Sequence, residues 1–228
     1  MNILAIETAT TACAVGVATT NEEELIHVVD DGQRHTEALA LTISALLDEL
    51  GLTPRDIGRV MVDRGPGLYT GLRVGIATAL ALAQGIGCEL VGATSLELLA
   101  NGAYDAGVRG TVVSCVDARR GEVFAQAFSL DDSLGELQAP KVRTARDVAE
   151  EWASLATPVT FTGDGVERYL DDFSAVANGR LFSQRVPSVH AALALARRRV
   201  PLEVLTPLYL READAVANFT TRTRSARP

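Results

Sequence analysis

Two turns that each follow a strand-like run carry residues able to bind a nucleotide phosphate. Such turns bind phosphate through small residues and backbone N–H groups, and a neighbouring acid can hold a metal-bound water. The first turn, residues 7–11, offers an acid and three hydroxyls. They are Glu7, Thr8, Thr10 and Thr11. This pattern allows weak binding of ATP or ADP, and a β-hairpin with a polar tip is the alternative.

The second turn, residues 117–121, suits a phosphate less well. It places Arg119 and Arg120 where a close-fitting turn favours Gly or Ser. The bulk of these side chains argues against nucleotide binding, whereas their charge could attract a phosphate. We expect ATP to bind weakly if at all, and we expect no cofactor to be required.

A glycine-rich loop at residues 64–75 lies between a predicted strand and a predicted helix. Gly65 and Gly67 allow a positive φ or a close backbone approach, and Thr70 is placed to cap the helix. The loop could hold an anion at the helix N-terminus, so Gly65 and Gly67 join the candidate nucleotide site. It is not a P-loop, because no Gly-Lys-Ser/Thr follows. A turn that only packs is the alternative.

The remaining residues contain no recognisable catalytic or metal-binding set. The three histidines, His27, His35 and His190, have no neighbour at a metal-ligand spacing. The Gly-x-Ser-x-Gly signature of serine hydrolases is absent. The three cysteines form no Cys-x-x-Cys pair, a pattern typical of proteins in a reducing cytosol. We therefore expect no metal site.

The composition is that of a globular protein, with 47% hydrophobic and 22% charged residues in a chain of 228. There are 21 basic and 29 acidic residues, which gives a net charge of −8. An acidic chain is a poor non-specific ligand for nucleic acids or anionic membranes. No signal peptide is recognisable, and the longest apolar run, residues 74–83, is too short to span a bilayer. We expect a cytoplasmic protein.

Hydrophobic periodicity predicts an α/β fold of two lobes with the element order βββαβαβα, the second lobe being degenerate. The first half contains strands at 3–7, 13–18, 24–29, 59–63 and 89–92 and helices at 33–50, 69–85 and 95–104. The second contains strands at 111–117, 122–128, 137–142 and 159–162 and helices at 144–155, 166–175 and 189–200. We expect a first lobe that carries dimerisation over residues 1–105, a second lobe over 106–213, and a frayed tail over 214–228.

The predicted helix at 69–85 is apolar on all sides, since Arg73 and Thr78 are its only polar residues between Leu72 and Ala83. A helix on a sheet normally shows a polar face to water, so this one needs further cover. The preceding helix offers small residues away from its leucines, and together the two could form half of a four-helix interface with another protein. Burial inside the chain's own core is the alternative. The predicted interface residues are His35, Ala38, Thr42, Ala45, Val74, Ala77, Thr78 and Ala81.

Four motifs, taken in order, resemble those of the TsaB (YeaZ) family of bacterial tRNA threonylcarbamoyladenosine biosynthesis proteins. They are residues 3–10 (ILAIETAT), 64–75 (RGPGLYTGLRVG), 117–124 (DARRGEVF) and 207–211 (PLYLR). The resemblance is strong over residues 1–128 and at 207–211. Leu68-Tyr69 stands where the family more often has Ser-Phe.

The resemblance implies an actin-like ATPase fold of the sugar-kinase and Hsp70 type. Members of the family look like non-catalytic relatives of TsaD, a protein also described as glycoprotease-like. TsaD holds a metal in an H-x-E-x-H stretch, and its two imidazole positions correspond here to Ser95 and Leu99. Neither side chain binds iron or zinc as imidazole does. The resemblance thus implies a chain that neither holds this metal nor catalyses the transfer.

The implied role is that of a partner subunit. The chain would form a heterodimer with TsaD, join TsaE in the assembled complex, and support threonylcarbamoyl transfer to the tRNA adenosine next to the anticodon. It would contact tRNA only indirectly and form a homodimer when alone. The alternative is an enzyme of the same fold, either a small ATP-dependent kinase or ATPase, or a metallopeptidase-like enzyme.

Overall fold

The first sheet contains five strands in the order β3-β2-β1-β4-β5, seen in a computed structural model that describes residues 1–30, 35–155 and 157–211. The strands are β1 (Asn2–Glu7), β2 (Cys13–Ala18), β3 (Glu24–Val29), β4 (Ile57–Asp63) and β5 (Glu89–Ala93). β1, β2 and β3 pair as antiparallel hairpins, whereas β4 and β5 run parallel to β1. The central strands are apolar at nearly every position, and a strand of this composition is buried on both faces.

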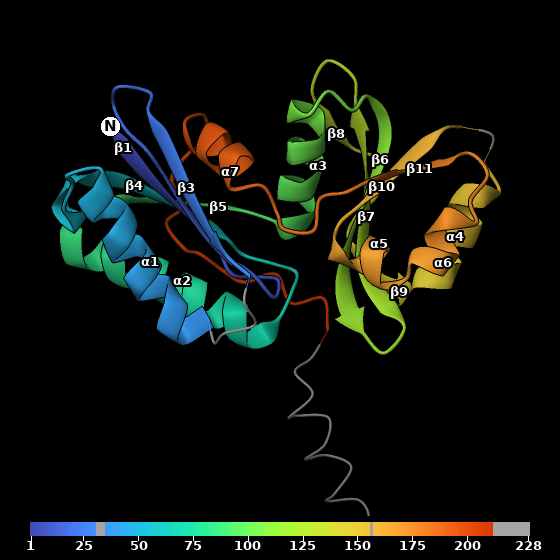
Figure 1. The fold of residues 1–228 in the computed structure, drawn as a ribbon, viewed down its shortest axis with the longest axis horizontal. Helices are drawn as coiled ribbons and strands as arrows, with labels where there is room; N and C mark the ends of the chain where they lie inside the picture. Colours follow the sequence, from blue (N-terminus) through green and yellow to red (C-terminus); the bar gives the residue numbers. More distant parts are fainter. Residues whose placement is uncertain (31–34, 156, 212–228) are drawn as a thin grey trace, which may run out of the picture.

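Helices cover both faces of this sheet (Figure 1). On one face lie α1 (His35–Glu49) and α2 (Tyr69–Ile86), with the short 3-10 helix η1 (Pro54–Asp56) between them in the chain. The apolar face of α1 packs against buried side chains of β1, β2 and β4. Its core residues are Leu39, Ile43, Leu46 and Leu47. The other face is covered by α7 (Val189–Ala196), which contacts β1, β2 and β4.

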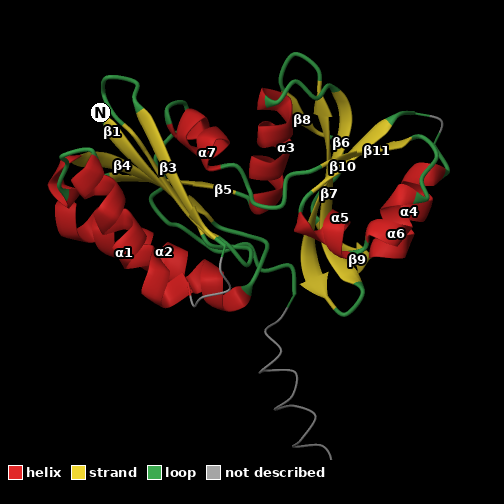
Figure 2. Ribbon diagram, viewed as in Figure 1, coloured by secondary structure: helices red, strands yellow, loops and turns green. Residues whose placement is uncertain are grey.

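The second sheet has the strand order β11-β10-β6-β7-β8, and β9 pairs with β7. Its strands are β6 (Gly110–Arg119), β7 (Glu122–Leu130), β8 (Leu134–Glu136), β9 (Lys141–Thr144), β10 (Val159–Thr162) and β11 (Gly179–Phe182). One face carries α3 (Ser95–Asp105), and the other carries α4 (Ala145–Ala153), α5 (Asp164–Arg168) and α6 (Leu170–Ser174). The order of layers is therefore α1/α2, first sheet, α7 and α3, second sheet, and α4–α6 (Figure 2).

Two helices pack on the sheet of the other lobe, which corrects the prediction for both. α3 was expected in the first lobe, but Leu96 and Leu99 bury against the second sheet. α7 was expected in the second lobe, but Val189 and Leu193 bury against the first sheet. The two helices contact each other between the sheets. The lobes thus share a central helical layer, which sequence order alone does not reveal.

Three element predictions in the second lobe also differ from the structure. The strand predicted at 137–142 is replaced by β8 and β9, and β11 was not predicted because its residues are largely exposed. The helix predicted at 166–175 divides into α5 and α6 at Tyr169, where ψ is 43°. The Tyr169 hydroxyl accepts a hydrogen bond from Gly121 N and donates one to Asp117 Oδ1. These contacts with the β6–β7 turn hold Tyr169 at the position where the helix is interrupted.

No helix within the described residues is long and apolar enough to cross a bilayer. The tail predicted over residues 214–228 lies outside the described part of the chain.

Candidate functional site

The turn between β1 and β2 is closed by its own carboxylate. Glu7 ends β1 and is buried. Its Oε1 accepts hydrogen bonds from Ala9 N at 2.7 Å and from Thr10 N at 3.3 Å. Backbone N–H groups are what such a turn offers to a phosphate. Here two of these N–H groups already donate to the buried carboxylate of Glu7. Thr8 and Thr10 lie in the turn as predicted, but these two amides are not free for a phosphate.

The glycine-rich loop packs directly on this turn. Leu68 N donates to Ala9 O at 2.7 Å, and Thr8 Oγ1 donates to Gly71 O at 2.8 Å. A Cβ on Gly67 would lie only 2.2 Å from Ala9 O. Glycine is therefore needed at this position to let two backbones approach, and this contact supports the alternative of a turn that packs.

Gly65 also has its backbone groups engaged within the chain. Its φ is +98°, its N–H donates to Asp63 Oδ1 at 2.7 Å, and its carbonyl accepts from Ser95 N at 3.0 Å. Ser95 Oγ donates to the same Asp63 oxygen at 2.8 Å. Gly65 thus connects the end of β4 to the start of α3.

Glu7 and Asp63 form a buried acidic pair at the ends of the adjacent parallel strands β1 and β4. Burial raises the pKa of Glu7 well above its usual range, and the charge of Asp63 raises it further. Burial raises the pKa of Asp63 to about 7, even though the Gly65 N–H and the Ser95 hydroxyl favour the carboxylate. One oxygen of each acid has no hydrogen-bond partner among the described residues. Such a pair repels a phosphate when ionised.

The acid in the turn between β6 and β7 lies among positive charges, whereas Glu7 lies beside a second acid. Asp117 Oδ1 accepts from Arg119 N at 2.8 Å, and Oδ2 pairs with the guanidinium groups of Arg119 at 3.0 Å and Arg168 at 3.2 Å. Arg119 and Arg120 adopt left-handed φ values of 64° and 58°. Asp117 N donates to Asp164 Oδ1 at 2.9 Å, and burial raises the pKa of Asp164 to about 6.

A cavity of about 260 Å³ lies where the two turns face each other across the lobes. Thr11 is the one predicted hydroxyl that lines it, because Thr8 and Thr10 are buried. The other lining side chains are three arginines and three acids, so their charges balance. They are Arg119, Arg168, Arg185, Asp117, Asp164 and Glu167.

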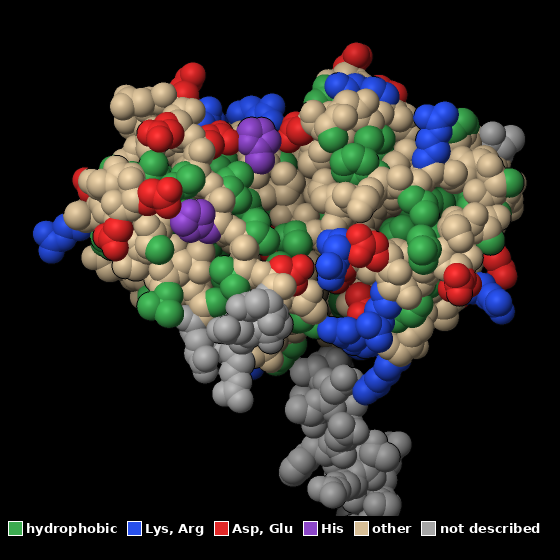
Figure 3. Space-filling model, in the orientation of Figure 1, with side chains coloured by type: hydrophobic (Ala, Val, Ile, Leu, Met, Phe, Trp, Pro, Cys, Tyr) green, Lys and Arg blue, Asp and Glu red, His purple; other side chains and the backbone are tan. Residues whose placement is uncertain are grey.

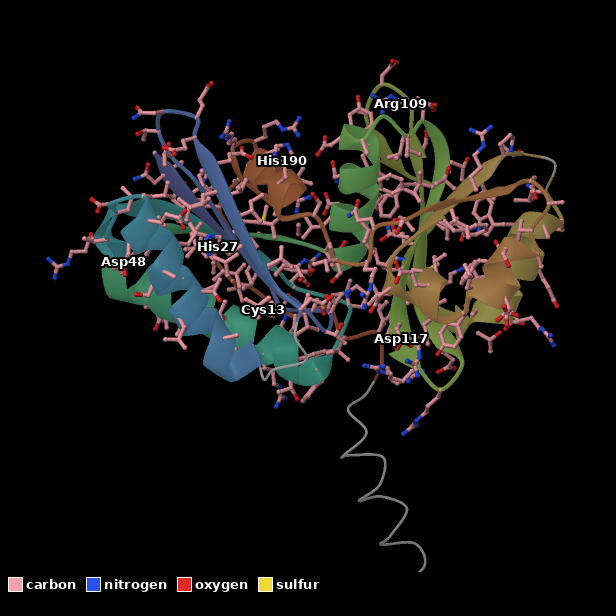
Figure 4. The ribbon with its side chains drawn as sticks, viewed as in Figure 1. Cys13, His27, Asp48, Arg109, Asp117 and His190 are labelled. Carbon is pink, nitrogen blue, oxygen red and sulfur yellow. The ribbon has the colours of Figure 1, made fainter. Side chains whose placement is uncertain are left out.

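Both signs of charge also gather on the surface where the lobes meet (Figure 3), and Asp117 lies at the edge of the second lobe that faces the first (Figure 4). Arg185 connects the lobes, pairing with Asp30 at 3.6 Å and Glu167 at 3.0 Å. This balance of charge leaves little net attraction for a polyphosphate.

Ser95 and Leu99, the positions that the resemblance matches to metal ligands, lie in the first two turns of α3. Ser95 is hydrogen-bonded to Asp63, and Leu99 is fully buried in the apolar layer beneath the second sheet. Across the described residues, no three His, Cys, Asp or Glu side chains are grouped as a metal would require. The donor set at this place therefore does not fit an imidazole-bound metal.

The paired helices α1 and α2 carry the predicted interface residues. Ala45, Ala77 and Ala81 are exposed, and Ala38, Val74 and Thr78 are half-buried. Thr42 is buried and donates from Oγ1 to Ala38 O at 2.8 Å. His35 begins α1, and its side chain lies outside what is described. Exposed small side chains thus occur on both helices, and the two helices contact each other.

Two features of these helices were not predicted from the sequence. Leu41 is 72% exposed, and its position out of phase with the buried leucines of α1 is a signal that could have identified it. A groove of about 300 Å³ runs between the helices and ends at η1. Ile43, Leu47, Thr78 and Leu82 are among its lining residues. The groove adds an apolar recess to the small-residue surface.

Comparison with known proteins identifies relatives over nearly the whole chain. The family model of TsaD, tRNA N6-adenosine threonylcarbamoyltransferase, matches residues 29–183. The tRNA threonylcarbamoyladenosine biosynthesis protein TsaB of Bacillus subtilis is 28% identical, over 96% of this chain and 98% of that protein. YeaZ from Pseudomonas aeruginosa superposes with a TM-score of 0.78 at 26% identity, over 92% of this chain and 99% of that one.

A more distant structure shares the fold alone. The activator of 2-hydroxyisocaproyl-CoA dehydratase from Clostridium difficile, solved with bound ADPNP, gives a TM-score of 0.52 at 12% identity, over 100% of this chain and 99% of that one. The predicted actin-like α/β fold is confirmed by these structural relatives.

Proposed function

Because the chain belongs to the TsaB (YeaZ) family, we propose that it is a non-catalytic subunit for tRNA threonylcarbamoyladenosine synthesis, one that binds TsaD and supports its threonylcarbamoyl transfer. The observation that carries this proposal is the surface of α1 and α2. Ala45 and Leu41 of α1 and Ala77 and Ala81 of α2 are exposed, and an apolar groove runs between the two helices. Clustered apolar surface of this kind is typical of a protein interface.

The shape of this surface favours a helical partner. Small side chains let helices approach closely, and two such helices can pack against two more in a four-helix arrangement. TsaD, which shares the family's domain, can supply an equivalent pair. In its absence the same surface can close on a second copy of this chain, because an isologous patch satisfies two-fold symmetry. TsaE joins the assembled complex.

The non-catalytic part of the proposal rests on donor chemistry. Serine and leucine at positions 95 and 99 cannot replace two imidazole ligands. The net charge of −8 also disfavours a chain that grips tRNA by its phosphates. We therefore place tRNA on the partner's side of the complex.

A kinase or ATPase is the candidate from another class, and the two turns argue against it. Ala9 N and Thr10 N are held by Glu7, and Arg119 N is held by Asp117. A phosphate would have to displace a carboxylate at each turn. A metallopeptidase would need the imidazole ligands that positions 95 and 99 lack.

Reconstitution of tRNA modification tests the proposal. Unmodified tRNA is incubated with ATP, threonylcarbamoyl precursor and either this chain alone, TsaD with TsaE, or all three proteins. Digestion and chromatography then measure threonylcarbamoyladenosine. We expect product only with all three proteins. Product from this chain alone would contradict a non-catalytic role, and full yield without it would contradict a supporting one.

A further inference from the structure

Three segments that lie far apart in the sequence line one cavity of about 160 Å³. They are the glycine-rich loop with the start of α2, the β6–β7 hairpin, and the chain after α7. Tyr69, Arg119, Phe124, Tyr209 and Arg211 are among the lining residues. This cavity is separate from the one between the two turns, although Arg119 lines both.

The cavity concentrates aromatic rings in a chain that has few of them, since aromatic residues make up 5% of the sequence. The rings of Tyr69 and Tyr209 lie 5.1 Å apart between centroids at an interplanar angle of 36°. Tyr69 is 36% exposed and Tyr209 is 41% exposed. Buried Phe124 adds a third ring to the lining. Two partly exposed tyrosines side by side offer a stacking surface to a planar ligand.

Arginine side chains surround these rings. The Arg73 guanidinium lies 3.8 Å from the centroid of the Tyr69 ring, and Arg73 Nε donates to the Tyr209 hydroxyl at 3.4 Å. Arg211 donates to Ala118 O at 2.8 Å and pairs with Glu122. Arg73 thus links the two rings, and Arg211, which also lines the cavity, is fixed to the second lobe.

We propose that this cavity binds a nucleobase that carries a phosphate, from a free nucleotide or from an unpaired position of an RNA. Bases of any sequence stack on aromatic side chains, and arginine adds cation–π and phosphate contacts. A cavity of roughly 150 Å³ accommodates a ring the size of benzene. A single-ring base, or one ring of a purine, therefore fits inside the cavity. The sugar and phosphate stay outside, beside Arg73.

The site differs from the nucleotide site predicted at the two turns. That site would hold the phosphates on backbone N–H groups, whereas this one holds the base on tyrosine rings. The proposal does not rest on the proposed function, because it concerns a ligand of this chain alone.

Calorimetry on the full chain tests the proposal with four probes: AMP, adenosine, ribose 5-phosphate and a single-stranded RNA octamer. The variant Tyr209→Leu removes one ring. Its matched control is Tyr104→Leu, because Tyr104 forms the same kind of pair elsewhere, with the Arg109 guanidinium 4.0 Å from its ring centroid. Circular dichroism verifies that both variants are folded.

We expect AMP to bind and ribose 5-phosphate not to bind at millimolar concentrations. Tyr209→Leu should weaken AMP binding about tenfold, the usual cost of removing one stacking ring, and Tyr104→Leu should leave it unchanged. Arg73→Gln should weaken binding of AMP but not of adenosine. If the octamer binds more tightly per site than AMP, RNA is the source of the base; equal affinity indicates a free nucleotide.

Three results would overturn the proposal: failure of both AMP and the octamer to bind, unchanged affinity in Tyr209→Leu, or an equal loss in Tyr104→Leu.

Discussion

The two hairpin turns occupy equivalent places in the two sheets, yet their acids have neighbours of opposite charge. Both Glu7 and Asp117 accept a backbone N–H from their own turn. Glu7 lies beside Asp63, a second buried acid, whereas Asp117 lies between the guanidinium groups of Arg119 and Arg168. In both turns the amides that could bind a phosphate are thus engaged by a carboxylate, while the charge surrounding that carboxylate differs between the two turns.

The neighbours of each turn explain the difference. The glycine-rich loop covers the first turn so closely that Gly67 has no room for a side chain. The second turn faces α5 and the open junction between the lobes, which leave space for Arg168 and Tyr169. Close packing therefore fixes the conformation of the first turn, whereas ion pairs and hydrogen bonds fix that of the second.

The largest expected effect comes from filling the contact over the first turn. Gly67→Ala places a Cβ against the Ala9 backbone, which cannot move aside cheaply. We expect a loss of about 3 kcal/mol of stability, measured by thermal and urea unfolding followed by circular dichroism. Gly121→Ala is the matched control in the second turn. Its Cβ would meet nothing within 4 Å, so only the strain of a φ of +82° remains, at about 1 kcal/mol. Equal losses would refute a packing difference between the turns.

Next in size is the pH dependence of the buried acidic pair. Folding raises the pKa of Asp63 to about 7 and raises that of Glu7 as well. For Asp63, the folded chain therefore binds more protons than the unfolded chain between about pH 4 and pH 7. The contribution of Asp63 to stability is therefore greatest below this window and falls as the pH rises through it. Asp63→Asn removes one charge while keeping an acceptor for Gly65 N. We expect this variant to be more stable than the wild type by about 2 kcal/mol at pH 8, with a smaller gain at pH 5.

Denaturant titrations at both pH values measure this difference. A gain that did not depend on pH would show that Asp63 is not the titrating group.

Removing the acid of the second turn should have the opposite sign and a smaller size than removing Asp63 from beside the first turn. Asp117→Asn leaves Arg119 and Arg168 without their shared carboxylate, and partly exposed ion pairs contribute little. We expect a loss of about 1 kcal/mol at pH 8, reduced by high salt. A double-mutant cycle with Arg168→Gln isolates the pair. Stabilisation by Asp117→Asn would mean that the two turns do not differ in electrostatics.

The smallest expected effect concerns the phosphates of ATP. Because the amides of both turns are engaged, the β- and γ-phosphates should gain little, and MgATP should bind within about threefold of AMP. Calorimetry of the isolated chain with and without Mg²⁺ measures the ratio. Micromolar affinity that requires Mg²⁺ would show that at least one turn opens to a triphosphate.

Much of the first lobe could be predicted from periodicity. The helix predicted at 69–85 is α2 (Tyr69–Ile86), and strand β4 ends at Asp63 as expected. Local patterns succeed there because each element repeats its apolar residues over several turns. They fail at α3 and α7, since an apolar helical face does not reveal which sheet it will cover.

The site was only partly accessible to sequence reasoning. The acids and glycines of the turns were recognisable by type and spacing. That Glu7 turns its carboxylate onto its own amides depends on turn geometry, which no spacing records. Tyr69 and Tyr209 meet because the chain after α7 returns to the start of α2, a contact over 140 positions that local pattern cannot show.

The central claim, that this chain acts as a partner through α1 and α2, is tested most directly by Ala77→Glu. Ala77 is exposed on the small-residue surface, so the monomer should stay folded by circular dichroism. An unpaired charge buried in an interface costs several kcal/mol, or about a thousandfold in affinity. Ala153→Glu is the matched control, because Ala153 is an exposed alanine at the end of α4 in the second lobe. Co-purification with TsaD should be lost in Ala77→Glu and retained in Ala153→Glu. A folded Ala77→Glu variant that still binds TsaD with wild-type affinity would contradict the claim.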